Sequence, residues 1–239
     1  MKKRLDHLLV EKKIVQTRSQ AESYIRLGKI LVAGKIIQKP GYFVDETAEI
    51  KIAQKVQYVS RAGLKLESVA KALKVNFRDK VVLDVGSSTG GFTDYALRNG
   101  AKKVIAVDVG TNQLHPSLRI NPKVELFEKT DIRNFETDED IDIVVIDVSF
   151  ISIREILPSV VKMANPKTKI LAMVKPQFEV GRNGTIRGVV KNNALRRKTL
   201  QEFEQWCVLN KLFIQQKRDS EVKGSRGNQE RFYLIKIAV

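Results

Sequence analysis

A glycine-rich turn carries the strongest chemical signal in the sequence. The segment VLDVGSSTGGFTDYAL (82–97) begins with an apolar run that contains Asp84, continues through a turn and ends in a helix-like stretch. The residues of the turn and of the helix start are Gly86, Ser87, Ser88, Thr89, Gly90, Gly91 and Phe92. Glycines let a backbone approach a ligand closely, and the free amides of a helix start bind polar groups. The segment lacks the G-x-G-x-x-G spacing of dinucleotide sites and the Lys-Ser/Thr of phosphate-binding loops. The turn therefore predicts a different nucleoside ligand, unless it is a plain strand-to-helix connection.

The spacing D-x-G-x-x-x-G-G-F resembles motif I of the S-adenosylmethionine-dependent methyltransferases, which implies that cofactor. Two further acids follow later apolar runs. Asp108 ends VIAVDV, where a carboxylate can accept both ribose hydroxyls of a nucleoside. Asp131 follows the next run and could accept from an adenine amino group. Each is a candidate cofactor ligand, although either could be an ordinary loop acid.

Four more charged residues lie at or near the ends of predicted strands. Asp147 closes VVIDV and Lys175 closes ILAMVK, while Lys65 lies in YVSRAGLKLE and Glu230 in GNQERFYL. Ligands of parallel sheets bind beyond the carboxyl ends of the strands. The four side chains are therefore expected to form a charge-paired cluster. Unrelated surface ion pairs are the alternative, and Glu221 is a rival to Glu230.

Residues 60–239 must position these groups. Apolar runs predict strands at 81–85, 104–109, 124–128, 141–148, 169–175 and 231–239, and helical patterns lie at 90–99, 151–164 and about 192–210. Alternation of strands and helices indicates a parallel sheet covered by helices on both faces. The predicted fold class is α/β, with a doubly wound, Rossmann-like domain.

Residues 1–59 are expected to form a separate small α+β unit. A helical pattern covers 5–14, Thr17 and Gln20 form a capping-box pattern for a second helix that stops at Gly28, and strand-like pieces lie at 29–34, 35–40 and 49–53. Residues 4–44 resemble the S4-type RNA-binding domain. Phosphate contacts are expected from Arg4, Lys12, Arg18, Arg26 and Lys29, although such charges could also form a solvated helix face.

The segment 176–192 follows Lys175 directly and contains three glycines. Arg182 and Arg187 could meet RNA phosphates, which suggests a loop that closes over a substrate. A simple connecting loop is the alternative. Phe178 could stack on a base or pack internally.

Five segments together, SRAGLKLE, DVGSSTGGFTD, DVSF, VKPQFE and GNQERF, resemble the TlyA family, whose catalytic domain is similar to the FtsJ ribose methyltransferases. The resemblance implies S-adenosylmethionine-dependent 2′-O-methylation of a ribosomal RNA ribose, that of a cytidine. It also implies that Lys65, Asp147, Lys175 and Glu230 form a Lys-Asp-Lys-Glu catalytic tetrad. The family also carries the label haemolysin.

Such a tetrad suits methyl transfer to an alcohol. A ribose hydroxyl is a weak acid, and its alignment with the methyl group provides much of the acceleration. Lys175 is the candidate base or hydroxyl-orienting group, and Lys65 would supply positive charge. Asp147 and Glu230 would fix the two ammonium groups.

Composition narrows the partners. The 239 residues carry a net charge of +16, which favours binding to nucleic acid. No run approaches the roughly 18 apolar residues that a membrane helix needs. Cys207 is the single cysteine, which fits a reducing compartment, so we expect a cytoplasmic protein. With two histidines and one cysteine, no metal site is expected.

Two other functions remain open from the sequence. A non-catalytic RNA-binding or ribosome assembly factor could keep the cofactor as a structural ligand. A membrane-active haemolysin is disfavoured by the lack of long apolar runs, and leakage of liposomes would test it.

Overall fold

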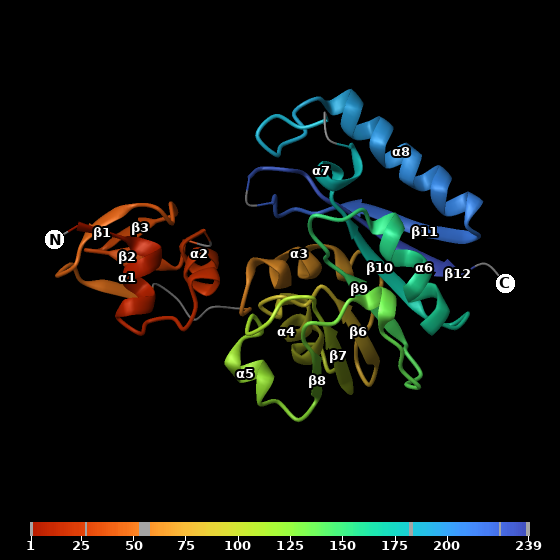
Figure 1. Cartoon of the computed structure of the whole chain (residues 1–239), viewed down its shortest axis with the longest axis horizontal. Coiled ribbons are helices and arrows are strands. Elements are labelled where there is room, and N and C mark those ends of the chain that lie inside the picture. The colour runs from red at the N-terminus through yellow and green to blue at the C-terminus, as the bar shows by residue number, and fades with distance from the viewer. Residues whose placement is uncertain (1, 27, 53–57, 182–183, 225, 238–239) are drawn as a thin grey trace.

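The computed structural model describes residues 2–26, 28–52, 58–181, 184–224 and 226–237. A small N-terminal part and a larger C-terminal part are visible in Figure 1. Residues 53–57, between them, lie outside the described ranges. Tyr58 and Val59 already pack with the larger part: Tyr58 lies in its core, and the Val59 amide donates to Asp94 over 2.8 Å.

The described residues of the small part form two helices and five short strands. They are β1 (Lys2–Arg4), α1 (Leu5–Glu11), α2 (Arg18–Arg26), β2 (Ile30–Val32), β3 (Lys35–Ile37), β4 (Phe43–Asp45) and β5 (Ile50–Ile52). Strand β1 pairs with β4, and β2 lies between β3 and β5. Leu5, Leu8 and Leu9 on α1 pack against Ala21 and Ile25 on α2, as the helical spacing predicts. Strands β1 and β4 were not predicted.

The capping pattern at the start of α2 is confirmed. The Gln20 amide donates to the Thr17 hydroxyl over 3.1 Å. The side-chain oxygen of Gln20 reaches back to the amide of Gln16, one residue before Thr17, over 2.9 Å. Gly28 follows α2 with a φ of +68°, a backbone conformation that favours glycine.

The larger part is a seven-stranded sheet with the order β11-β12-β10-β9-β6-β7-β8. Its strands are β6 (Val81–Val85), β7 (Lys103–Val107), β8 (Val124–Phe127), β9 (Ile143–Ile146), β10 (Lys169–Val174), β11 (Leu212–Asp219) and β12 (Arg231–Ile237). The five strands β6 to β10 are parallel, as predicted. The last predicted strand, β12, runs antiparallel to β10, and the unpredicted β11 pairs antiparallel with β12. The sheet is therefore mostly, not wholly, parallel.

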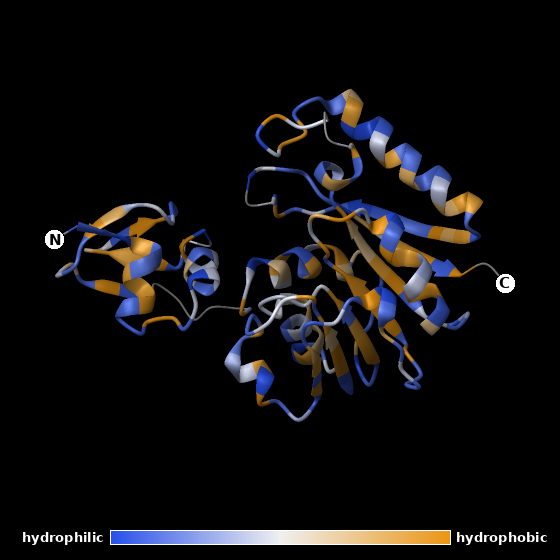
Figure 2. Cartoon of the chain, in the orientation of Figure 1, coloured by the Kyte–Doolittle hydropathy of each residue, from blue (hydrophilic) through white to orange (hydrophobic). Residues whose placement is uncertain are grey.

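Helices cover both faces of the sheet (Figure 1). They are α3 (Arg61–Ala70), α4 (Gly91–Arg98), α5 (Pro116–Arg119), α6 (Ile153–Met163), α7 (Pro176–Glu179) and α8 (Asn193–Leu209), with a short 3-10 turn, η1, at Ile132–Asn134. Side chains of α6 and α8 share one apolar core with the sheet, and those of α3 and α4 share another. The hydropathy colours of Figure 2 show the central strands as mostly hydrophobic, whereas α8 carries both hydrophilic and hydrophobic residues.

The chain direction in the sheet determines where a ligand can bind. From β6 the chain moves outward through β7 and β8, and then returns to β9 on the other side of β6. Loops leaving β6 and β9 therefore separate and open a crevice at the carboxyl ends of these strands. The glycine turn and Asp147 follow these two strands.

A buried acid links the elements of the small part. The Asp6 side chain is fully buried, and it accepts from Arg4 and Arg18, each over 2.9 Å. Burial alone would raise the pKa of the Asp6 carboxyl, but hydrogen bonds from both arginines outweigh burial and lower the pKa to about 2. Arg4 and Arg18, two predicted RNA contacts, thus also stabilise the fold.

We predict that Asp6→Asn lowers the stability of the small part by about 2 kcal/mol at neutral pH. The ionised carboxyl stabilises the folded state above its unfolded pKa, and this gain is lost as the pH falls toward 2. Exchange of the α1 amide hydrogens should speed up about 30-fold at pH 7, and the difference should shrink at pH 3. Glu49→Gln, which removes one partner of an exposed pair with Lys51, is the control and should change exchange little. Equal exchange of Asp6→Asn and wild type at pH 7 would contradict the prediction.

Candidate active site

The glycine turn packs tightly against three neighbouring segments. Gly86 has a φ of +80°, and a Cβ there would lie 2.9 Å from the carbonyl oxygen of Asp147. A Cβ on Gly90 would meet Leu114 and Leu118, and one on Gly91 would collide with the start of α3. The glycines therefore let the turn lie against β9, α5 and α3.

A cavity of about 430 Å³ opens beside this turn, and we call it the cofactor cavity. Of the predicted cofactor ligands it is lined by Gly86, Ser88, Asp108 and Asp131. The Asp108 carboxylate accepts the amides of Ser88 over 2.8 Å and Gly110 over 2.7 Å. Asp108 thus holds the turn in place from the end of β7.

Asp131 lies at the far side of the cofactor cavity, after β8. It caps η1 by accepting the amide of Arg133, and it forms an ion pair of 2.6 Å with the Arg133 side chain. The arginine lines the same cavity. Asp131 is therefore at the predicted place, with its carboxylate engaged by Arg133.

The remaining predicted cofactor residues lie around or behind the turn. Thr89 faces two neighbouring cavities, and Ser87 is buried in the turn. Phe92 lies in the core, where its ring centroid is 6.0 Å from that of Phe232. Asp84 is fully buried within β6 and accepts the Thr93 hydroxyl over 2.6 Å. Asp84 and Phe92 therefore support the turn from behind.

Among the described residues, the side-chain donor to the Asp84 carboxyl group is the neutral hydroxyl of Thr93. Burial raises its pKa to about 7, and the charges of Asp147 and Asp108 act in the same direction, while the Thr93 hydroxyl opposes them. One carboxylate oxygen of Asp84 and the hydroxyl of Ser87 have no hydrogen-bond partner within the described part of the chain. Two buried polar groups thus lie next to the cofactor cavity with hydrogen-bonding capacity to spare.

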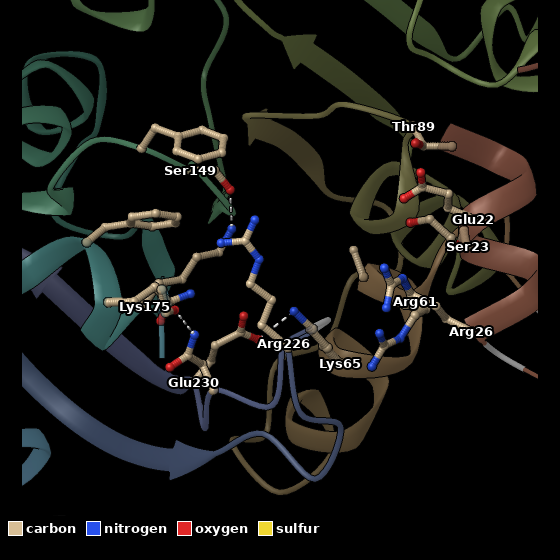
Figure 3. A pocket seen from close by; sticks show the side chains of 18 of the residues that line it. Glu22, Ser23, Arg26, Arg61, Lys65, Thr89, Ser149, Lys175, Arg226 and Glu230 are labelled. Carbon is tan, nitrogen blue, oxygen red and sulfur yellow. Dashed lines mark hydrogen bonds and ion pairs between the residues drawn. The ribbon is translucent and has the colours of Figure 1, made fainter. Parts of the chain in front are cut away.

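The four expected catalytic residues form two ion pairs. The Lys175 ammonium lies 2.5 Å from Asp147. The Lys65 ammonium lies 2.5 Å from Glu230, as Figure 3 shows. Lys65, Lys175 and Glu230 are 9%, 8% and 2% exposed. Buried charges require such partners. The rival acid Glu221 is exposed and lies 3.5 Å from Arg218, outside this cluster.

A second cavity, of about 550 Å³, reaches this cluster from the side of the small part, and we call it the substrate cavity. Lys65, Lys175 and Glu230 line it, while Asp147 lines the cofactor cavity. Ser149 and Phe150 line both cavities. The Lys175–Asp147 pair therefore lies where the two cavities meet.

Ser149 and Phe150 are functional candidates that the sequence reasoning missed. The Lys175 ammonium donates to the Ser149 hydroxyl over 2.8 Å. Phe150 is 91% exposed with a φ of +67°, and its ring centroid is 5.2 Å from that of Phe178. A large exposed ring in a left-handed conformation is costly for the protein alone. The available signal was the position of DVSF directly after a strand.

The predicted RNA contacts spread over both parts of the chain. Arg26 lines the substrate cavity, while Lys12 is exposed and Lys29 half-buried on the small part. Arg187 is exposed on the segment after α7. Arg182 lies outside the described residues, so its placement stays a prediction.

The segment 176–192 begins with α7 and is anchored at two places. Glu179 accepts the Ser152 hydroxyl over 2.6 Å and the amide of Ile153 over 2.8 Å, so it ties α7 to the start of α6. The buried Asn228 donates to the carbonyl of Gly188 over 2.8 Å and accepts the amide of Val190 over 3.0 Å. The segment is therefore held beside the loop that carries Glu230.

Comparison with known proteins identifies both parts of the chain. Residues 58–237 match the model of the FtsJ-like methyltransferase family, and residues 3–50 match that of the S4 domain. A Campylobacter jejuni relative, the 23S rRNA (cytidine-2′-O)-methyltransferase TlyA, is 42% identical over 74% of this chain and 70% of its own. Hemolysin A of Brachyspira hyodysenteriae is 36% identical over 95% of this chain and 97% of its own.

A solved structure from Streptococcus thermophilus, whose name places it among the hemolysins, is 36% identical to this chain. It aligns with a TM-score of 0.79 over 99% of this chain and 89% of its own. Its similarity therefore extends over the S4 domain as well as the larger part. Within the described residues, no helix is both long and apolar enough to cross a membrane.

We predict that ionisation of Asp84 destabilises the cofactor-free protein. A raised pKa means that the folded state keeps a proton that the unfolded state has lost, so stability falls as the pH rises from about 4 to about 7. Asp84→Asn removes this penalty and should gain up to about 4 kcal/mol relative to wild type across that range. Urea unfolding followed by the fluorescence of Trp206, the single tryptophan, measures the difference.

Asp142→Asn is the matched control for Asp84→Asn. Burial would raise the pKa of Asp142, but Lys80 and the Val81 amide lower it overall. Its replacement should therefore cost stability as the pH rises, with the opposite sign. If the free energy of unfolding changed with pH in the same way for Asp84→Asn and wild type, the raised pKa of Asp84 would be refuted.

Proposed function

Because the chain belongs to the FtsJ-like methyltransferase family and carries an S4 domain, we propose that it methylates the 2′-oxygen of a ribose in ribosomal RNA. The observation that carries this proposal is the Lys175–Asp147 pair at the junction of two cavities. One cavity is bordered by the glycine turn, and the other reaches the S4 domain. A donor and an acceptor bound in these cavities would meet at this pair.

The residues beside the glycine turn fit S-adenosylmethionine. A volume of about 430 Å³ lies within the usual range for small-molecule sites. Asp108 is the proposed acceptor for the ribose hydroxyls and Asp131 that for the adenine amino group. Gly86 and Ser88 border the same space, and Asp84 and Ser87 retain unpaired oxygens behind it. The cofactor supplies an electrophilic methyl group on a sulfonium.

Lys175 is the proposed group that handles the ribose hydroxyl. Its ammonium form has three N–H donors, and two of them face Asp147 and Ser149. The third can be directed at the 2′-oxygen, which it would orient for in-line attack. As the bond between this oxygen and the methyl group forms, the hydroxyl proton would pass to water in the substrate cavity. The two acceptors favour this orienting role of Lys175 over that of a base.

The second pair is proposed to hold the substrate side of the site. Glu230 fixes Lys65 at 2.5 Å, and both line the substrate cavity. A second ammonium there adds positive potential where RNA phosphates and the reacting oxygen must come together. Lys65 and Glu230 are thus assigned to electrostatic stabilisation, and Asp147 to holding Lys175.

The proposal also assigns the two parts of the chain. Residues 1–59 are the proposed RNA-binding domain and residues 60–239 the proposed catalytic domain, and Tyr58 and Val59 already pack with the latter. A cytidine is the proposed target, because the TlyA relative is named for this nucleotide. With ribosomal RNA as substrate, we place the protein's action in the cytoplasm.

Transfer of a labelled methyl group to purified ribosomal subunits and to free ribosomal RNA tests the proposal. The label should appear in a nucleotide whose 3′ linkage resists alkaline hydrolysis, because a 2′-O-methyl group blocks that cleavage. Label in a base would refute the ribose assignment. Binding of S-adenosylmethionine and RNA without any transfer would instead support a non-catalytic assembly factor.

We predict that Lys175→Met reduces methyl transfer by about 10²- to 10³-fold, the usual cost of removing one hydrogen-bond donor from a developing oxyanion. Binding of S-adenosylmethionine, measured by calorimetry, should persist, because Lys175 lines the substrate cavity and not the cofactor cavity. Lys169→Met, at the opposite end of β10, is the matched control and should retain activity. Near-normal transfer by Lys175→Met would remove Lys175 from the mechanism.

Phe150 and Phe178 are proposed to stack on the base of the target nucleotide. Stacking of a base on an aromatic ring contributes about 1–3 kcal/mol. Phe150→Ala should therefore lower kcat/KM for RNA by about 5- to 150-fold, without loss of thermal stability, because the side chain is exposed. Phe213→Ala, which removes another exposed ring on β11, should leave kcat/KM unchanged. An equal loss in both variants would contradict the stacking role.

A further inference from the structure

The S4 domain forms one wall of the substrate cavity. Four residues of α2 line it, namely Ser19, Glu22, Ser23 and Arg26. Ser60, Arg61 and Lys65, at the N-cap and in the first half of α3, line the same cavity. Figure 3 shows Arg61 beside the α2 residues and Lys65 pointing toward Glu230. The cavity lined by Lys65, Lys175 and Glu230 is therefore completed by both domains.

The charge of this lining favours an anion. Five cationic side chains line the cavity (Arg26, Arg61, Lys65, Lys175 and Arg226), against two anionic ones (Glu22 and Glu230). Glu230 is already engaged by Lys65. Positive charge therefore remains in excess at the boundary between the domains.

Arg26 and Arg61 face each other across this boundary. Burial lowers the pKa of the Arg61 guanidinium, and the nearby charge of Arg26 lowers it further. Both guanidinium groups line the same cavity, so two like charges lie close to one another there. An anion placed between them would relieve this repulsion.

The position of Arg61 is fixed by the loop that leads to Glu230. One of its terminal nitrogens donates to the carbonyl of Lys223 over 2.6 Å. A guanidinium carries five N–H donors, so others remain for a ligand. Arg61 and Lys65 are four residues apart on α3, which places them on one face of the helix, about 5–6 Å apart at Cβ.

We propose that Arg26 of the S4 domain and Arg61 of the catalytic domain jointly bind one RNA backbone phosphate, next to the ribose that Lys65 and Lys175 receive. This assignment rests on the proposed function. Arginine suits it because its planar fork binds phosphate oxygens in a bidentate manner. The bound strand thereby neutralises the repulsion between the domains and joins the two walls of the site.

The salt dependence of RNA binding by the full-length protein tests this proposal. Arg26→Gln, Arg61→Gln and the double variant are compared with Arg197→Gln, which removes the same charge from an exposed position on α8. The affinity for a ribosomal RNA fragment is measured over a range of salt concentrations. Calorimetry with S-adenosylmethionine confirms that each variant is folded, and Arg61→Lys serves as a second variant that keeps the charge but loses the fork.

One shared phosphate predicts a specific pattern. In the double variant, the slope of log K against log salt should fall by about 0.7–0.9, the contribution of a single phosphate. Twice that fall would mean two separate phosphates and would overturn the proposal. Binding by both single variants equal to that of Arg197→Gln would overturn it as well.

A synthetic RNA with single neutral methylphosphonate linkages gives the second readout. One neutral linkage, beside the methylated nucleotide, should lower the affinity of wild type for RNA as much as the double substitution does. The same linkage should not lower the affinity of the double variant any further. If every linkage weakens both proteins equally, the proposal fails. Methyl transfer by wild type is recorded in parallel, so its absence would refute the proposed function independently of the binding result.

Discussion

The pairing of two buried lysines with a buried glutamate and a half-buried aspartate is the constraint on which the site depends. A charge removed from water is tolerated only beside an opposite charge or several hydrogen bonds. Asp147 follows β9, Lys175 follows β10, Glu230 precedes β12 and Lys65 lies on α3. Because β10 lies between β9 and β12, the antiparallel β12 brings the start of its strand to the edge where β9 and β10 end. The direction of this one strand thus gives Lys65 its partner.

The glycine turn serves packing and ligand binding at once. A side chain on Gly86 would meet the backbone of Asp147, so the turn and the backbone of Asp147 are held in contact. Asp108, which follows β7, accepts the amide of Ser88 in the same turn. The geometry of the cofactor cavity and that of the Lys175–Asp147 pair are therefore coupled through a few close backbone approaches. A change in the turn would disturb both.

Much of the fold could be predicted from the sequence, because buried strands such as VVLDV and IDIVVIDV are continuous apolar runs. Strand β11 was missed because most of its residues are exposed and polar, and α3 was missed because Gly63 and Lys65 interrupt its pattern although both are buried. The four catalytic candidates could be named from strand ends and family likeness. Which lysine pairs with which acid could not, because it depends on the sheet order. Ser149 and Phe150 line both cavities, and although their position directly after a strand was a signal, the meeting of the two cavities there could not be read from the sequence.

The surfaces that the two domains present to each other are polar, which favours contact with a substrate over permanent packing of one domain on the other. Each domain has its own apolar core, and the cavity walls between them carry serines, arginines and a glutamate. Polar contacts of this kind stabilise a relative orientation weakly, so such domains can shift against each other. The positive charge is also shared: residues 1–59 have 12 basic and 6 acidic side chains (+6), which leaves +10 of the total +16 for the rest. A polyanion that touches both domains would therefore stabilise the arrangement in which the catalytic pairs face a complete cavity. Binding of the correct RNA and assembly of the site would then be one and the same event.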